Sequence, residues 1–211
     1  MIPQDSIQTI ASVRILHVMA TEHECTPALR ALIAPLITGV GPVEAGVALG
    51  AALGALDAKG QAPDVIIALG SSGSRTLDHA GIYQASHVSY RDMDCSPLGF
   101  PRGVTPFSGE PAIFDLGPAL PGLRQASLSS GGGIVSGADY DAVGADMVDM
   151  ETYSYARAAR MFGKRLIVLR GVSDGREPLS GKLTDWTETL EEIGLGLASA
   201  LNIAHAEIAQ R

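Results

Sequence analysis

Aromatic and charged side chains are both scarce in this chain of 211 residues. Phe, Trp and Tyr together make up 5% of it and Asp, Glu, Lys and Arg 18%, whereas apolar residues reach 46%. This composition excludes a disordered chain, which has little apolar content and much charge. A chain of this length buries roughly 70% of its unfolded surface. Because no repeat or low-complexity linker divides it, we expect one globular domain, residues 1–211.

Positive charge is also in short supply. The 15 Lys and Arg residues are scattered along the chain and are outnumbered by 23 Asp and Glu, which gives a net charge of −8. Without a basic stripe to neutralise phosphates, we expect no nucleic-acid partner. No run approaches the ~18 uncharged apolar residues of a membrane span, and residues 1–12 lack a basic start followed by an apolar core. The sequence therefore predicts a cytoplasmic protein without membrane contact.

Cysteine is nearly absent. Cys25 and Cys95 are the only two, and they lack the spacing of a zinc site or a redox pair. This excludes a disulfide framework. The five histidines are dispersed, and no His, Cys and carboxylate cluster has the spacing of metal ligands. We therefore expect no metal and no organic cofactor.

Short apolar runs alternate with helical segments along the chain. The runs at 14–19, 64–69 and 165–170 are rich in branched residues, as in strands buried on both faces. Further strands are predicted at 84–90 and 125–130, helices at 43–59, 151–162 and 185–209, and turns at 38–42 and 70–74. A helical stretch is also expected after the first strand. This alternation predicts an α/β fold, a three-layer αβα sandwich around a central twisted mixed sheet.

Polar side chains gather where such sheets bind ligands, next to the carboxyl ends of the strands. Glu22 and Glu24 follow the first strand, and Ser71 follows the strand at 64–69. Asp149 and Glu151 lie just before and at the start of the helix at 151–162, and Arg170, Ser173 and Asp174 lie at or after the end of the strand at 165–170. The sequence therefore predicts one polar site at this edge of the sheet.

Asp174 is the candidate acid. A carboxylic acid at the end of a buried strand can protonate a leaving group, and Ser173 can orient it by a hydrogen bond. The same Ser-Asp pair after a strand is equally an ordinary turn or helix cap. The pair alone leaves both interpretations open.

Two glutamates can likewise be interpreted either as functional or as purely structural residues. Glu151, at a strand-helix junction, can accept both hydroxyl protons of a ribose, or it can simply favour the helix dipole. Glu24 can position and deprotonate a water beside Arg170 and Ser71, or it can be a solvated charge at a helix start. The residues by themselves do not decide between these roles.

Taken together, the segments resemble the nucleoside phosphorylase superfamily, and specifically the methylthioadenosine/S-adenosylhomocysteine nucleosidases. Residues 148–152 (V-D-M-E-T) are similar to the family segment V-E-M-E-A, and residues 168–174 (V-L-R-G-V-S-D) to V-R-A-I-S-D at a similar separation. Supporting similarities lie at 19–24, 39–41, 69–73 and 134–137. The resemblance implies a nucleoside phosphorylase-like fold and hydrolysis of a purine nucleoside to adenine and a 5′-substituted ribose.

The resemblance also implies roles for the residues of the reaction centre. Asp174 would protonate N7 of adenine while Ser173 steadies it. Glu24 would activate the attacking water with help from Arg170 and Ser71.

Substrate contacts are implied in the same way. Met150 and Glu151 would hold the ribose, next to Asp149, which stands where the family commonly has Glu. Tyr140 would stack on the purine, where the family usually has Phe. The main chain of Asp141, which replaces an apolar residue, would contact the base.

The family typically forms homodimers, and the resemblance implies one here. The loop around Phe107 would complete the alkylthio pocket of the neighbouring subunit. The surrounding segment, 95–111, is rich in Pro and Gly and matches the family poorly, so the 5′-substituent of the natural substrate stays open.

Two other functions compete with hydrolysis. A purine nucleoside phosphorylase would use the same fold and Asp174 but attack with phosphate, which the charges of Glu22 and Glu24 would repel. A non-catalytic nucleoside-binding protein would not need the combined acid, base and ribose contacts. A flavodoxin-like nucleotide-binding protein has less support, because no phosphate-binding glycine loop follows the first strand. Hydrolysis is therefore favoured.

Overall fold

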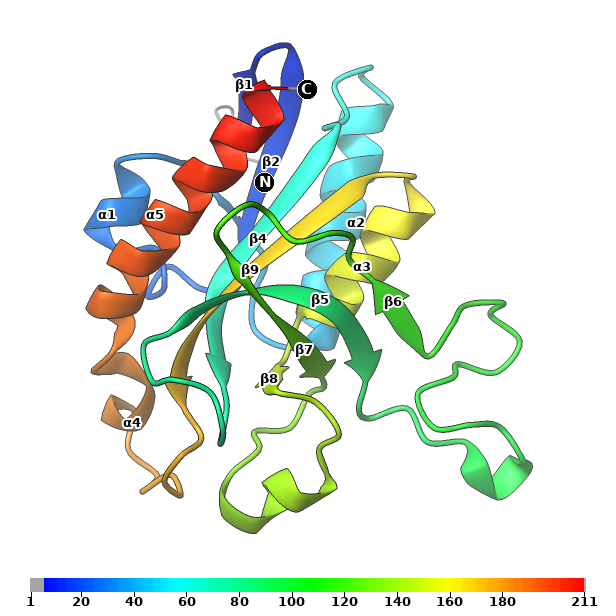
Figure 1. Ribbon diagram of the computed structural model, residues 1–211. Coiled ribbons are helices and arrows are strands. Elements are labelled where there is room, and N and C mark those ends of the chain that lie inside the picture. The colour runs from blue at the N-terminus through cyan, green and yellow to red at the C-terminus, as the bar shows by residue number, and fades with distance from the viewer. Residues whose placement is uncertain (1–5, 211) are drawn as a thin grey trace.

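The computed structural model describes residues 6–210, in which nine strands form one mixed sheet between two pairs of helices. Helices α1 (Pro27–Arg30) and α5 (Leu190–Ala209) cover one face, and α2 (Pro42–Asp57) and α3 (Thr152–Met161) cover the other (Figure 1). A short helix, α4 (Thr184–Thr187), precedes α5. The predicted α/β sandwich with a mixed sheet is confirmed.

The sheet curls strongly enough for part of it to close on itself. Its strands are β1 (Ile7–Ile10), β2 (Val13–Met19), β3 (Leu36–Ile37), β4 (Val65–Gly73), β5 (Ile82–Tyr90), β6 (Ile113–Asp115), β7 (Arg124–Ser130), β8 (Met147–Asp149) and β9 (Arg165–Asp174). Pairing runs from β4 through β8, β7, β5 and β9 and back to β4. Five strands therefore surround a common interior, and their ends converge.

Alternating side chains of the central strands supply two separate cores. On β2 and β4, Leu16 and Ile66 pack against the side of α2 and α3, whereas Ile15 and Ile67 pack against the side of α1 and α5. Successive side chains of a strand point to opposite faces, so a strand with helices on both sides must be apolar throughout. This is why the apolar residues of these strands form continuous runs in the sequence rather than alternating with polar residues.

Three boundaries differ from the sequence predictions. The turn predicted at 70–74 is wrong, because β4 continues to Gly73 and stays paired with β9 as far as Asp174. The last helix begins at Leu190, not near residue 185. The first strand is followed by turns and only one helical turn, α1, which starts at Pro27. Residues 70–73 and 170–174 therefore belong to rigid paired strands.

The membrane prediction can be examined only in part. Within residues 6–210 no helix has the length and apolar character needed to cross a membrane. The expectation that residues 1–12 contain no leader involves residues 1–5, which lie outside the described range.

A pair of histidines, one of them buried, joins the sheet to α5. The Nε2 atoms of His17 on β2 and His205 on α5 lie 2.9 Å apart, and His17 is buried. Burial lowers the pKa of the His17 imidazole to about 3, and the neighbouring His205 adds to the effect. The folded protein therefore holds His17 neutral at pH values where an unfolded chain would protonate it.

We expect acid to destabilise the fold through His17. Below pH 6.5 the unfolded chain binds a proton that the folded chain refuses, so stability is full above this pH and falls below it, by about 2 kcal/mol at pH 5. Urea unfolding at pH 7.5 and pH 5.0 would measure this for wild type and His17→Gln. An equal loss of stability in both proteins would contradict the assignment.

Candidate active site

A cavity of about 600 Å³ lies where the strands converge. Its walls include residues at or just after the ends of six strands, namely Ala20, Gly73, Arg91, Gly133, Asp149 and Asp174. Seven residues predicted for the site line it: Glu24, Ser71, Asp149, Met150, Glu151, Ser173 and Asp174. The fold thus brings together side chains that lie up to 150 residues apart (174 − 24).

Asp174 ends β9 with its carboxyl group held in place. Ser173 Oγ donates a hydrogen bond to Asp174 Oδ2 at 2.6 Å, and the carbonyl of Asp174 accepts one from the backbone N–H of Ser74 at 2.8 Å. Burial raises the pKa of the Asp174 carboxyl, although the bond from Ser173 opposes the rise. The side chain is therefore fixed and more readily protonated than an exposed aspartate.

Glu24 lies in the turn after β2, and Ser71 holds one of its oxygens. Oε1 accepts hydrogen bonds from both the backbone N–H and the hydroxyl of Ser71, at 2.7 and 2.8 Å. Oε2 is buried and has no hydrogen-bond partner among the described residues. A buried carboxylate oxygen without a partner is costly, so this atom is suited to accept a proton from a bound molecule.

Arg170 lies behind the cavity wall and is fully buried. Its Nη2 and Nε atoms donate to Asp149 Oδ2 at 2.8 and 3.1 Å, and Nη2 also donates to Thr152 Oγ1. Asp149, predicted to contact substrate, thus also forms a buried ion pair. A Cβ atom on Gly70 would lie 3.0 Å from Glu24 Oε1 and 3.4 Å from Arg170 Nη1. Glycine at this position therefore lets both groups approach the same point of β4.

Glu151 stands at the start of α3, with Met150 before it. Its Oε1 accepts a hydrogen bond from the backbone N–H of Gly41 at 2.8 Å. Burial, and then the charge of Asp149, raise the pKa of Glu151 to about 7, whereas the bond from Gly41 acts in the opposite direction. Near neutral pH this carboxyl group can therefore either accept or donate a hydrogen bond.

The structure places the two predicted base contacts outside the cavity wall. Tyr140 is buried beside Asp174, and burial followed by that charge raises the pKa of its hydroxyl to about 12. Asp141 is exposed and pairs with Arg75 at 2.7 Å. Ile134 and Val135 line the cavity instead. They come soon after β7, whereas Tyr140 and Asp141 lie beyond them in a 3-10 helix, Gly137–Ala142.

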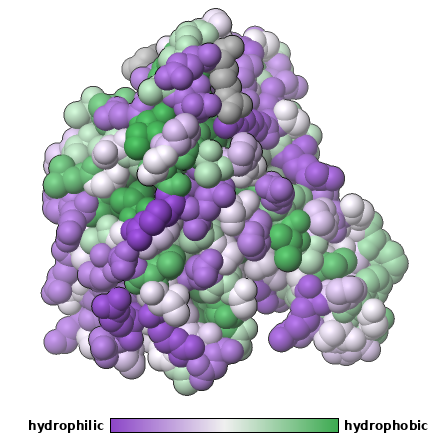
Figure 2. Space-filling model, viewed as in Figure 1, coloured by the Kyte–Doolittle hydropathy of each residue, from purple (hydrophilic) through white to green (hydrophobic). Residues whose placement is uncertain are grey.

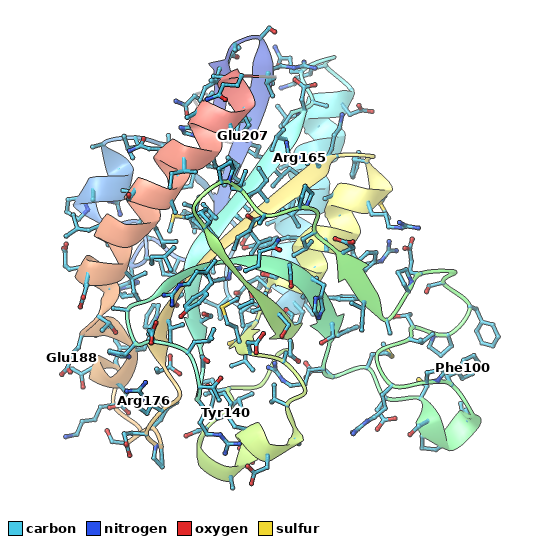
Figure 3. All side chains as sticks on the ribbon, viewed as in Figure 1. Phe100, Tyr140, Arg165, Arg176, Glu188 and Glu207 are labelled. Carbon is cyan, nitrogen blue, oxygen red and sulfur yellow. The ribbon has the colours of Figure 1, made fainter. Side chains whose placement is uncertain are left out.

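Phe107 also lies outside the cavity of its own chain. Its side chain is 96% exposed, and its ring stacks edge-on against Phe100 at 5.5 Å. Figure 1 shows the segment 95–111 projecting from the sheet, and Figure 3 shows Phe100 at its outer end. Its predicted role in a neighbouring subunit's site stays a prediction.

Sequence reasoning missed the residues that cover the cavity from the segment before α5. Leu179, Lys182, Leu183 and Trp186 all line it, and the indole Nε1 of Trp186 donates to Ser71 Oγ at 2.8 Å. The sequence predicts one continuous helix at 185–209, whereas Trp186 lies on the separate short helix α4. The only signal in the sequence is that Trp186 is the single tryptophan of the chain.

Among residues 6–210 no group of three or more His, Cys, Asp or Glu side chains is arranged to hold a metal ion.

Comparison with known proteins gives consistent matches. Residues 30–206 match the family model of the Phosphorylase superfamily. A 5′-methylthioadenosine/S-adenosylhomocysteine nucleosidase of Actinobacillus succinogenes is 27% identical over 168 residues, which cover 69% of each chain.

Solved structures show the same fold. A futalosine hydrolase of Helicobacter pylori superposes with a TM-score of 0.76 at 20% identity, covering 92% of this chain and 97% of the other. A mutant of the Helicobacter pylori nucleosidase with 5′-methylthioadenosine in its active site has a TM-score of 0.76 at 18% identity, covering 92% and 98%. Because the family model spans most of the sequence, the chain belongs to the Phosphorylase superfamily and is an enzyme, as its sequence motifs indicated.

Proposed function

We propose that this enzyme hydrolyses the N-glycosidic bond of a 5′-substituted adenosine, such as 5′-methylthioadenosine, S-adenosylhomocysteine or 5′-deoxyadenosine. The products are adenine and the 5′-substituted ribose. The observation that carries the proposal is the placement of three differently held carboxyl groups, Asp174, Glu24 and Glu151, on one cavity. The matching nucleosidase and hydrolase relatives support the same class of reaction.

Departure of the base requires a proton, because adenine is a poor leaving group as an anion. Asp174 supplies it to N7 of the purine, and the raised pKa of its carboxyl keeps it protonated at higher pH than an exposed aspartate. The hydrogen bond from Ser173 fixes the direction of the carboxyl group. Asp174 becomes a carboxylate as neutral adenine leaves.

The attacking water is activated on the other side of the site. Glu24 Oε2, which has no partner among the described residues, accepts a proton from the water as its oxygen bonds to the ribose C1′. Positive charge that develops on the ribose is stabilised by this carboxylate. Glu151 and the adjacent Met150 hold the ribose, with the carboxyl oxygens of Glu151 accepting from its hydroxyl groups.

Two features, the carboxylate of Glu24 and the pairing of Arg170, favour water over phosphate as the nucleophile. The guanidinium of Arg170 is bound to Asp149, so its charge is already neutralised. Arg91 lines the cavity, but its Nη atoms donate to the backbone carbonyls of Ser129, Gly131 and Gly133. The carboxylate of Glu24 would repel a phosphate dianion.

Purified protein should release adenine from 5′-methylthioadenosine in phosphate-free buffer, and added phosphate should not raise the rate. Chromatographic measurement of adenine and of the sugar product checks this. Release that requires phosphate and yields a ribose 1-phosphate would make the enzyme a phosphorylase and remove Glu24 from its role.

Asp174→Asn should lower kcat by about 100- to 10,000-fold, because an amide cannot give up a proton to N7. Binding of the nucleoside should remain measurable, since the side chain keeps its size. Asp139→Asn, at an exposed position outside the cavity, is the matched control. Near-normal turnover by Asp174→Asn would overturn the assignment.

The proposal includes a homodimer. Val43 and Val47 on α2 are 71% and 67% exposed, and Val40 and Ile134 at the mouth of the cavity are also exposed. Val43 and Val47 follow helical spacing and Val40 comes just before the helix, so the start of α2 presents an apolar stripe beside the cavity. Figure 2 shows further apolar surface on the projecting segment that carries Phe107.

Val47→Glu should convert a dimer into a monomer, because it places a charge within the apolar stripe. Sedimentation velocity would measure the mass of each species. Leu195→Glu, at an equally exposed apolar position on α5 on the opposite face of the sheet, should leave the mass unchanged. A wild-type monomer at micromolar concentration would contradict the homodimer.

A further inference from the structure

Trp186 is connected to Glu24 by a chain of two hydrogen bonds. The indole Nε1 of Trp186, on α4, donates to Ser71 Oγ at 2.8 Å. Ser71 Oγ donates in turn to Glu24 Oε1 at 2.8 Å. The three residues come from three separate elements, namely α4, β4 and the turn after β2. Tertiary packing therefore creates this chain.

The direction of the chain follows from its chemistry. An indole N–H can only donate, so Ser71 Oγ must be the acceptor of the first bond. A serine hydroxyl has a single proton, which is then directed at Glu24. Together with the backbone N–H of Ser71 at 2.7 Å, this gives Glu24 Oε1 two donors and leaves Oε2 unpaired among the described residues. One oxygen of the carboxylate is fixed while the other stays available.

We propose that Trp186 is a positioning residue that acts through the hydroxyl of Ser71 to fix the carboxylate of Glu24 for attack by water. This inference rests on the proposed hydrolysis. Trp186 also packs near His23, with ring centroids 6.3 Å apart, so it contacts the same turn that carries Glu24. The position of α4 and the orientation of the catalytic carboxylate are therefore linked.

The competing explanation is that Trp186 serves only as an apolar wall of the cavity. Phenylalanine would then replace it with little loss, because the ring would still cover the site. The hydrogen bond distinguishes the two explanations, since Phe keeps an aromatic ring and lacks the N–H. Trp186→Phe is therefore the informative substitution.

The hydrogen bond itself can be observed without measuring activity. Because the chain has one tryptophan, its ¹⁵N-edited NMR spectrum contains a single indole N–H signal. Ser71→Ala should move this signal upfield and speed its exchange with solvent, because the acceptor is removed. An indole signal that does not respond to Ser71→Ala would overturn the inference.

The catalytic effect is measured by a double-mutant cycle. Trp186→Phe should lower kcat by about 3- to 10-fold, with a smaller change in KM, because one neutral hydrogen bond is lost while the ring remains. In a Ser71→Ala background the same substitution should have no further effect on kcat, because the chain is already broken. Glu188→Gln, an exposed residue at the end of α4 that Figure 3 shows pointing outward, is the control and should keep wild-type kcat.

The outcomes separate this inference from the proposed function. If Trp186→Phe lowers kcat by the same factor with and without the Ser71 hydroxyl, hydrolysis stands and the positioning role is refuted. If wild type releases no adenine under any condition, the proposed function fails and the positioning role of Trp186 fails with it, whatever the indole signal shows.

Discussion

The buried ion pair between Arg170 and Asp149 joins the two halves of the site. Arg170 comes from β9, the strand that ends at Asp174, and Asp149 ends β8 just before Met150 and Glu151. Both side chains are almost fully buried, so removing one partner would leave an uncompensated charge, which typically costs about 3 to 5 kcal/mol. The bond from Arg170 to Thr152 extends the connection into α3. The candidate acid and the candidate ribose contact are therefore held relative to each other.

Two glycines on β4 leave space for the side chains that pack around the Arg170–Asp149 pair. Gly70 lies where the carboxylate of Glu24 and the guanidinium of Arg170 approach the strand. A Cβ atom on Gly73 would lie 2.9 Å from Asp174 Oδ1, and it would also collide with the hydroxyl of Tyr140. Because both glycines belong to a paired strand, they provide space for side chains rather than freedom for a turn. The segment read as a glycine turn is a rigid wall of the cavity.

The three carboxyl groups of the cavity differ in what surrounds them, and this difference suits a division of chemical roles. Asp174 is partly buried, and this burial favours its protonated form even though the hydrogen bond from Ser173 opposes it. Glu24 receives two hydrogen bonds from Ser71 on one oxygen, as a carboxylate does. Glu151 lies near the charge of Asp149 and binds the backbone of Gly41. Environment rather than residue type therefore distinguishes the candidate acid from the candidate base.

Local sequence determined the central strands and the residues at their ends. Apolar runs such as 165–170 can be recognised because a strand covered on both faces must be apolar throughout. Asp174 and Glu151, which the V-S-D and M-E motifs singled out, both line the cavity. Tertiary structure decided the partners. Arg170 binds Asp149, Ile134 lines the cavity in place of Tyr140, and Trp186 reaches Ser71 across 115 residues. These contacts depend on how the curled sheet and its loops come together in space. The pattern of apolar residues along one segment shows which face is buried, but not which distant segment will pack against it.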